Sequence, residues 1–195
     1  MSQEAKSLET KGMLADPGDH FRGRFEVERK FNVPDIEMVR HKLKAESAVP
    51  FAVGNEETDV FLDLPDGRLE NNSQFQILRH MRPSERVLWI SKGPEKDACV
   101  AMDLADFDKA LSVLKSLGFI ETSQLSKKRD IYFYGGLHLT LDKVEGLGSF
   151  VEIAAMTDDR AKLANLGLRI QSVICELELD DFPEEHRSYR QMLFG

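Results

Sequence analysis

A stretch near the start of the chain alternates between charged and apolar side chains. In Arg24-Phe-Glu-Val-Glu-Arg-Lys-Phe31, side chains two residues apart share a face if the stretch is a strand. One face then carries Glu26, Glu28 and Lys30, while the other carries three apolar side chains and Arg29. We expect such a strand where a sheet divides an apolar core from a wet cavity. Two carboxylates can hold a hard divalent cation, and the lysine beside them can hold a phosphate.

Length and composition indicate one globular domain. We expect it to span residues 19–195 of the 195-residue chain, after a loose polar tail over residues 1–18. The apolar fraction of 42% is enough for a core. No apolar run approaches the ~20 residues of a membrane helix, and no secretory signal pattern opens the chain. We therefore expect a cytoplasmic protein without a membrane partner.

Charge and cysteine content exclude further classes. A net charge of −8 argues against binding duplex nucleic acid, which needs an extended basic surface, although a local basic pocket remains compatible with it. The two cysteines, Cys99 and Cys175, do not have the spacing of a zinc site. We expect two buried thiols in a reducing compartment.

The rest of the chain is dominated by strand patterns in hairpin order. Helical spacing appears after Pro34-Asp35, after Asp103 as a helix cap with Gly118 as its end, and over residues 158–178 despite Gly167. Strand patterns cover residues 24–33, 59–63, 75–81, 86–92, 98–102, 125–134, 137–144 and 149–155. This order favours an α+β fold, in which an antiparallel barrel or strongly curved sheet has a polar interior and peripheral helices.

Charged residues recur at the inward positions of several strands. The candidate cavity collects the acids Glu26, Glu28, Asp142 and Glu152 and the bases Lys30, Arg79, Lys92, Lys127 and Arg129. A nucleoside triphosphate carries about four negative charges and travels with magnesium, so it needs cations along its length and carboxylates near the metal. The competing interpretation is that each charge lies on the solvated face of a sheet, which is the commoner situation for any one such residue.

Several segments together resemble a known family. Glu26-Val-Glu-Arg-Lys30 matches the Glu-x-Glu-x-Lys signature of the CYTH, or triphosphate tunnel metalloenzyme, superfamily. The chain resembles the class IV adenylyl cyclase branch from about residue 19 to 195, in the order and spacing of His20-Phe-Arg-Gly-Arg-Phe-Glu-Val-Glu-Arg-Lys30, Trp89-Ile-Ser-Lys-Gly-Pro94, Lys127-Lys-Arg129, Gly146-Leu-Gly-Ser-Phe-Val-Glu-Ile153 and Arg187-Ser-Tyr-Arg-Gln191.

The resemblance implies an eight-stranded antiparallel tunnel, a homodimer, and conversion of ATP to 3′,5′-cyclic AMP and pyrophosphate with Mg²⁺ or Mn²⁺. It implies metal binding by Glu28 and Glu152, with Glu26 and Asp142 in support. It implies triphosphate binding by Lys30, Arg79, Lys92, Lys127 and Arg129. Glu26, Glu28, Lys30 and Arg129 are the candidate catalytic residues, and Phe21 is the candidate contact for the adenine base.

Two other functions are compatible with the same residues. A triphosphatase acting on thiamine triphosphate, inorganic triphosphate or a nucleotide would use the same cavity with water as the nucleophile. A non-catalytic sensor would bind a nucleotide or polyphosphate without turnover, although a pure anion binder gains little from carboxylates unless a metal neutralises them. Product analysis separates the three.

Overall fold

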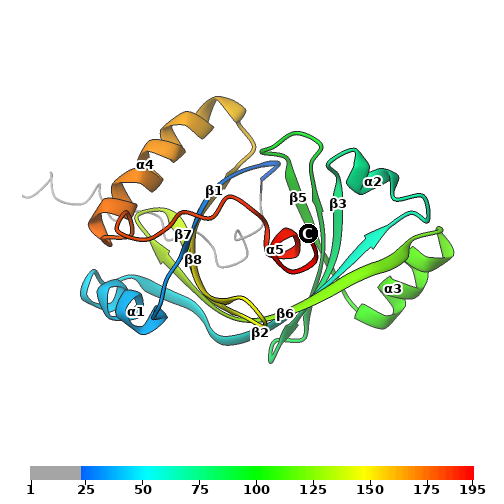
Figure 1. Cartoon of the computed structure of the whole chain (residues 1–195), viewed down its shortest axis with the longest axis horizontal. Coiled ribbons are helices and arrows are strands. Elements are labelled where there is room, and N and C mark those ends of the chain that lie inside the picture. The colour runs from blue at the N-terminus through cyan, green and yellow to red at the C-terminus, as the bar shows by residue number, and fades with distance from the viewer. Residues whose placement is uncertain (1–22) are drawn as a thin grey trace, which may run out of the picture.

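The computed structural model describes residues 23–195, which form one antiparallel sheet curled around a concave face (Figure 1). The strands lie in the order β1-β8-β7-β6-β2-β3-β4-β5. They are β1 (Phe25–Asn32), β2 (Val49–Asp63), β3 (Phe75–Arg82), β4 (Arg86–Lys92), β5 (Cys99–Leu104), β6 (Ile120–Tyr134), β7 (Leu137–Val144) and β8 (Gly148–Thr157). The predicted α+β fold with eight antiparallel strands is confirmed. The predicted tail over residues 1–18 and the candidate base contact Phe21 lie outside the described residues.

The sheet curls far enough for its two edge strands to meet at one end. Phe25 of β1 forms a bridge with Ala98, just before β5. The backbone N–H of Glu26 donates to the Asp97 carbonyl at 2.8 Å, and that of Cys99 donates to the Arg24 carbonyl at 3.0 Å. These bonds satisfy edge groups that would otherwise be open to other chains. Register shifts in the long β2–β6 pair let the middle of the sheet bend.

Four of the helices lie outside this curl or at its rim, and one lies on the concave side (Figure 1). They are α1 (Ile36–Ala45), α2 (Arg68–Asn71), α3 (Phe107–Ser116), α4 (Leu163–Glu176) and α5 (Tyr189–Phe194). The apolar faces of α1 and α4 share one core with β1, β7 and β8, in which Leu43, Leu139 and Ile170 are fully buried. Leu114 of α3 packs in a second core with residues of β2, β3 and β4. The outer helices thus leave the concave face to α5, to charged side chains and to a separate apolar cluster that includes Phe61, Ile90 and Tyr189.

The helix predicted to begin at Asp103 begins later. Asp103 lies in β5 opposite Leu88, and its carboxylate binds Arg86 at 2.6 Å. The cap is Asp106, whose side chain accepts a hydrogen bond from the Lys109 backbone at 2.9 Å. The prediction of Asp103 as the cap was wrong because ladder bonds to β4 keep the chain extended through Leu104.

The C-terminal part of the sequence also holds two differences from the prediction. The helix expected over residues 158–178 is a 3₁₀ turn at Arg160–Lys162 followed by α4, which runs through Gly167 without a break. Cys99 is buried as expected, but Cys175 is exposed on α4, and both thiols are free. None of the helices within residues 23–195 is long and apolar enough to cross a membrane.

Candidate active site

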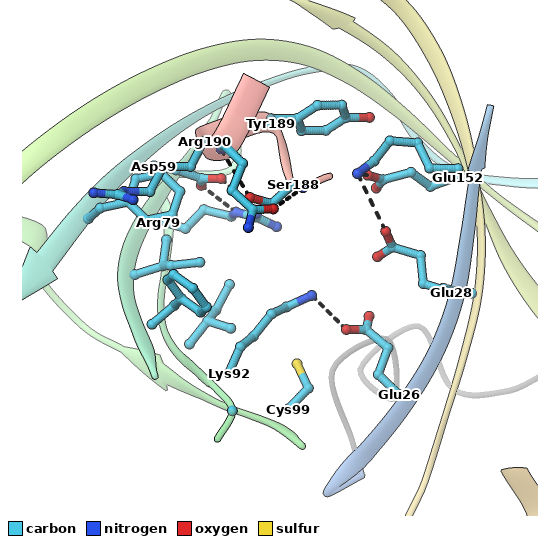
Figure 2. A pocket seen from close by; sticks show the side chains of 18 of the residues that line it. Glu26, Glu28, Asp59, Arg79, Lys92, Cys99, Glu152, Ser188, Tyr189 and Arg190 are labelled. Carbon is cyan, nitrogen blue, oxygen red and sulfur yellow. Dashed lines mark hydrogen bonds and ion pairs between the residues drawn. The ribbon is translucent and has the colours of Figure 1, made fainter. Parts of the chain in front are cut away.

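The concave face of the sheet and α5 enclose a cavity of about 490 Å³ (Figure 2). Ligand cavities in proteins commonly measure about 300–1,000 Å³. The lining includes eight of the ten residues that the sequence nominated, from β1, β3, β4, β6 and β8: Glu26, Glu28, Lys30, Arg79, Lys92, Lys127, Arg129 and Glu152. Charges from strands far apart in the sequence therefore share one cavity.

The alternation along β1 sends its two sets of side chains to opposite faces. Phe31 is buried in the outer core and Val27 packs against that core, while Lys30 lines the cavity. Lys30 lies directly opposite Glu152 of β8, and its Nζ is 3.5 Å from a Glu152 oxygen. The same Nζ is 3.9 Å from Glu28, a distance beyond a hydrogen bond.

Two acids of β2 that the sequence analysis did not nominate lie among the cations. Asp59 accepts two hydrogen bonds from Arg79, at 2.6 and 2.8 Å, and one from Lys127 at 2.7 Å. Glu57 is completely buried, with one carboxylate oxygen 3.1 Å from both Arg79 and Lys127. Glu57 and Asp59 are two residues apart on one strand, so the same alternation that marked β1 could have found them.

Asp142 lies behind the cavity rather than in its lining. It is fully buried, and Arg129 donates to it through Nε at 2.7 Å and through Nη2. The Tyr189 hydroxyl donates to the same carboxylate at 2.8 Å. Arg129 Nη2 also reaches Glu152 at 2.5 Å, so this guanidinium connects an acid behind the wall with an acid in the cavity. Asp142 thus contacts the cavity through Arg129.

Lys127 and Lys128 illustrate how strand parity selects the inward charge. The Lys127 side chain is 1% exposed and faces the cavity, whereas Lys128 is 72% exposed and lies 3.3 Å from Glu56 on the outside. At the end where β1 meets β5, Lys92 donates to Glu26 at 2.6 Å, next to Cys99 (Figure 2). The cavity therefore contains ion pairs from the end where β1 meets β5 to the end where α5 lies.

The electrostatic surroundings give the cavity acids Glu26, Glu28 and Glu152 different pKa values. Burial, reinforced by repulsion from Glu152 and Glu26, raises the pKa of Glu28 to about 7. Burial also opposes ionisation of Glu152, but Arg129 and Lys30 outweigh it and lower the pKa of Glu152 to about 2. The ion pair with Lys92 likewise outweighs burial and lowers the pKa of Glu26. Glu28 is thus the acid whose negative charge is least compensated.

The carboxylates Glu26, Glu28 and Glu152 are the type of ligand that binds a hard divalent cation. Carboxylate oxygens are the protein ligands that Mg²⁺ and Mn²⁺ prefer. In the arrangement described, Glu26 and Glu152 are held by cationic side chains, and residues 23–195 contain no group of three acids, histidines or cysteines already spaced around a metal. A cation beside Glu28 would relieve the repulsion that raises its pKa. The residues fit the metal chemically, and the acids would have to turn from their present partners to bind it.

Apolar side chains form another part of the cavity wall. They come from β2, β3, β4 and β6 and are Phe61, Phe75, Ile77, Ile90 and Leu125. The neighbouring loop approaches closely at Gly93, where a Cβ atom would lie 1.9 Å from the Ser73 carbonyl oxygen, so no larger residue fits there without a shift. An apolar wall beside a charged one suits a ligand with an aromatic part and a polyanionic part.

Comparison with known proteins identifies the family to which this fold and cavity belong. A family model described as the CYTH domain matches residues 24–189, so the chain belongs to the CYTH family. Adenylate cyclase CyaB of Aeromonas hydrophila is 40% identical to the chain over 173 residues, covering 89% of this chain and 91% of that protein. This similarity confirms the resemblance to class IV adenylyl cyclases.

Solved structures agree with this assignment. A Vibrio parahaemolyticus protein provisionally named an adenylate cyclase has a TM-score of 0.84 and 35% identity, covering 89% of this chain and all of that chain. A Hippeastrum protein for which a dominant triphosphatase activity is described has a TM-score of 0.59, with 88% of this chain and 94% of that chain covered. At 16% identity the second likeness concerns the fold alone.

Proposed function

We propose that the chain is an adenylyl cyclase that converts ATP to 3′,5′-cyclic AMP and pyrophosphate in the concave cavity. One observation carries the proposal: seven cationic side chains and five carboxylates line a cavity of about 490 Å³ in a chain 40% identical to an adenylate cyclase. Several of the charged side chains in the lining are buried, which strengthens their interactions with phosphate charge because low dielectric and fixed donors replace mobile water.

The cations would hold the triphosphate. Arg79 and Arg129 offer planar guanidinium groups that suit two phosphate oxygens at once, whereas Lys30, Lys92 and Lys127 act as point charges. Each is already oriented by a carboxylate, so the cavity presents them without a search among rotamers. Asp142 would support binding by fixing Arg129 from behind.

The apolar wall would hold the adenine base. Phe75 is half-buried and Phe61 is nearly buried, and both line the cavity beside Ile77 and Ile90. Aromatic and aliphatic side chains stack on or cover a flat base at little cost in solvation. We therefore propose that the base lies against β2, β3 and β4, and the role of Phe21 stays a prediction.

Mg²⁺ or Mn²⁺ would be held by Glu28 and Glu152, with Glu26 in support. Such an ion would supply charge neutralisation and would lower the pKa of a bound hydroxyl. The chain's own residues supply positioning. If the cations fix the triphosphate and the apolar wall fixes the base, the ribose is confined between them. Its 3′-oxygen forms a bond to the α-phosphorus as the bond to the pyrophosphate oxygen breaks, and the 3′-proton is released to solvent.

Product chromatography after incubation with ATP and Mg²⁺ or Mn²⁺ tests the proposal. Cyclic AMP with one equivalent of pyrophosphate is the expected result, and Glu28→Ala or Glu152→Ala should abolish it. Glu56→Gln, on the outer face of β2, serves as the matched control with unchanged turnover. Diphosphate with inorganic phosphate would identify a triphosphatase, and ATP binding without turnover would identify a sensor.

The assembly and the location of the protein also belong to this proposal. A homodimer and a cytoplasmic location remain the predictions that accompany a class IV cyclase. Sedimentation velocity over a range of protein concentrations tests the first. A single species of one-chain mass at micromolar concentration contradicts it.

A further inference from the structure

Tyr189 lies where α5 enters the concave side of the sheet, and its ring touches a cation of the cavity. The side chain is buried, and its ring packs edge-on against Phe150 with centroids 5.1 Å apart. Lys30 Nζ lies 4.4 Å from the centre of the Tyr189 ring, within the range of a cation–π contact. The ring therefore contacts the ammonium group of Lys30 from one side; Figure 2 shows Tyr189 at the cavity, above Glu152.

The Tyr189 hydroxyl reaches a second cation through one carboxylate. It donates to Asp142 at 2.8 Å, and Asp142 in turn accepts from Arg129 Nε at 2.7 Å. Lys30 belongs to β1 and Arg129 to β6, which are not neighbours in the sheet. One side chain thus connects two cations from separate parts of the wall.

The segment around Tyr189 is itself fastened at several points. The Arg187 carbonyl accepts a hydrogen bond from Lys30 Nζ at 3.0 Å. Ser188 and Gln191 form a reciprocal capping box that fixes the first turn of α5. Arg190 binds Glu70 of α2 and donates to the Ser123 hydroxyl at 3.1 Å. These contacts restrict the ring and hydroxyl of Tyr189 to one arrangement.

We propose that Tyr189 is a positioning residue for polyphosphate binding, which fixes the Lys30 ammonium through its ring and the Arg129 guanidinium through Asp142. The inference rests on the proposed function for the identity of the ligand, a chain of phosphates, and it requires no turnover. In this role Tyr189 acts through Lys30 and Arg129, although its side chain also lines the cavity. Its hydroxyl stabilises the charge of the acid that orients Arg129, and its ring limits the movement of Lys30.

Calorimetric titration with inorganic tripolyphosphate, with and without Mg²⁺, measures this role without relying on catalysis. Tyr189→Phe keeps the ring and removes the hydroxyl. Tyr189→Leu removes both. Tyr134→Phe is the matched control, because the Tyr134 hydroxyl also donates to a carboxylate, Glu176 at 2.9 Å, but on the exterior.

Removal of the Tyr189 hydroxyl should weaken tripolyphosphate binding roughly tenfold, since hydrogen bonds to charged groups are among the stronger ones. Loss of the ring should weaken it by about a further threefold. The Tyr134→Phe control should bind like the wild type. In an Arg129→Lys background, Tyr189→Phe should have little added effect, because lysine lacks the fork that Asp142 orients.

A packing role alone predicts different results. In that case Tyr189→Phe would match the wild type in affinity, and its effect would not depend on Arg129. Either result overturns the inference. If Tyr189→Leu does not fold, the phenylalanine variant and the Arg129→Lys cycle decide between the two roles. A wild-type protein that binds tripolyphosphate but makes no cyclic AMP refutes the proposed function and leaves this inference standing.

Discussion

Substituting Glu28 by glutamine should stabilise the ligand-free protein at alkaline pH. The pKa of Glu28 is raised to about 7 from an ordinary value of 4.5, first by burial and then by the charge of Glu152. Between these two pH values the folded chain holds a proton that the unfolded chain has lost. The free energy of unfolding therefore falls as pH rises through this window, and it stays lower above pH 7.

The size of the effect follows from the pKa. Each unit of difference between the folded and unfolded pKa corresponds to about 1.36 kcal/mol. Ionised Glu28 therefore lowers the free energy of unfolding by at most about 3 kcal/mol at pH 8. The side chain is 28% exposed, and screening by water in the cavity reduces the expected cost to about 2 kcal/mol. Glutamine removes the titrating group, so the variant should gain this amount at pH 8 and less than about 1 kcal/mol at pH 5.

Urea unfolding at pH 5 and pH 8, in metal-free buffer, measures the difference between wild type and variant. Glu56→Gln is the control, since Glu56 lies on the outer face with 57% of its side chain exposed. A variant that is no more stable than wild type at pH 8 would refute the reasoning. So would an equal gain at both pH values, because a proton-linked effect must change with pH. Added Mg²⁺ should reduce the gain by stabilising the wild type alone.

Three further results are expected. Phe75→Ala should raise the KM for ATP severalfold and leave the affinity for tripolyphosphate unchanged, because it removes part of the apolar wall and none of the cations. Kinetics and calorimetry measure the two quantities, and equal losses in both would contradict the proposed base site. Asp63→Ala should lower the free energy of unfolding by about 1–2 kcal/mol in urea titration, since Asp63 accepts from the backbones of Leu69 and Glu70 in α2. Arg129→Ala should abolish tripolyphosphate binding and lower the unfolding free energy by about 3 kcal/mol or more, because Asp142 keeps the Tyr189 hydroxyl but loses its buried cationic partner. A variant of wild-type stability in urea titration would contradict this expectation.

The local pattern was sufficient to predict the strand framework and much of the cavity lining. The period of two along β1 sets which side chains face inward, and it requires no knowledge of the rest of the fold. A hairpin turn then sets the pairing register of the next strand, and therefore which of its side chains face inward. The turn at Gly135-Gly136 pairs Tyr134 with Leu137, and counting back along both strands pairs Arg129 with Asp142, as observed. The sequence alone therefore contains enough information for that pairing.

Other parts of the site depend on contacts that local patterns do not encode. The six residues of α5 are too few for helical periodicity to stand out, and α5 reaches the concave side only through the path of the preceding segment. Glu57 lies in the part of β2 before residue 59, where the strand was not recognised. The ion pairs that separate Glu28 from Glu152 depend on the lateral order β1-β8-β7-β6, because Lys30 of β1 and Arg129 of β6 both reach Glu152 of β8.

The internal pairing of the cationic side chains has a consequence for selection among anions. Lys92, Lys127, Arg79 and Arg129 are each held by a carboxylate before any ligand enters. An incoming anion must therefore compete with carboxylates that are already close and, at Lys127, Arg79 and Arg129, buried. We expect chloride or a single orthophosphate to displace these carboxylates at too few positions to bind, whereas the proposed ligand, a chain of three phosphates with divalent ions, would give new partners to both the cations and the carboxylates. Under the proposed function we therefore expect the cavity to select anions by charge and length, so that simple salts of the cell leave it unoccupied.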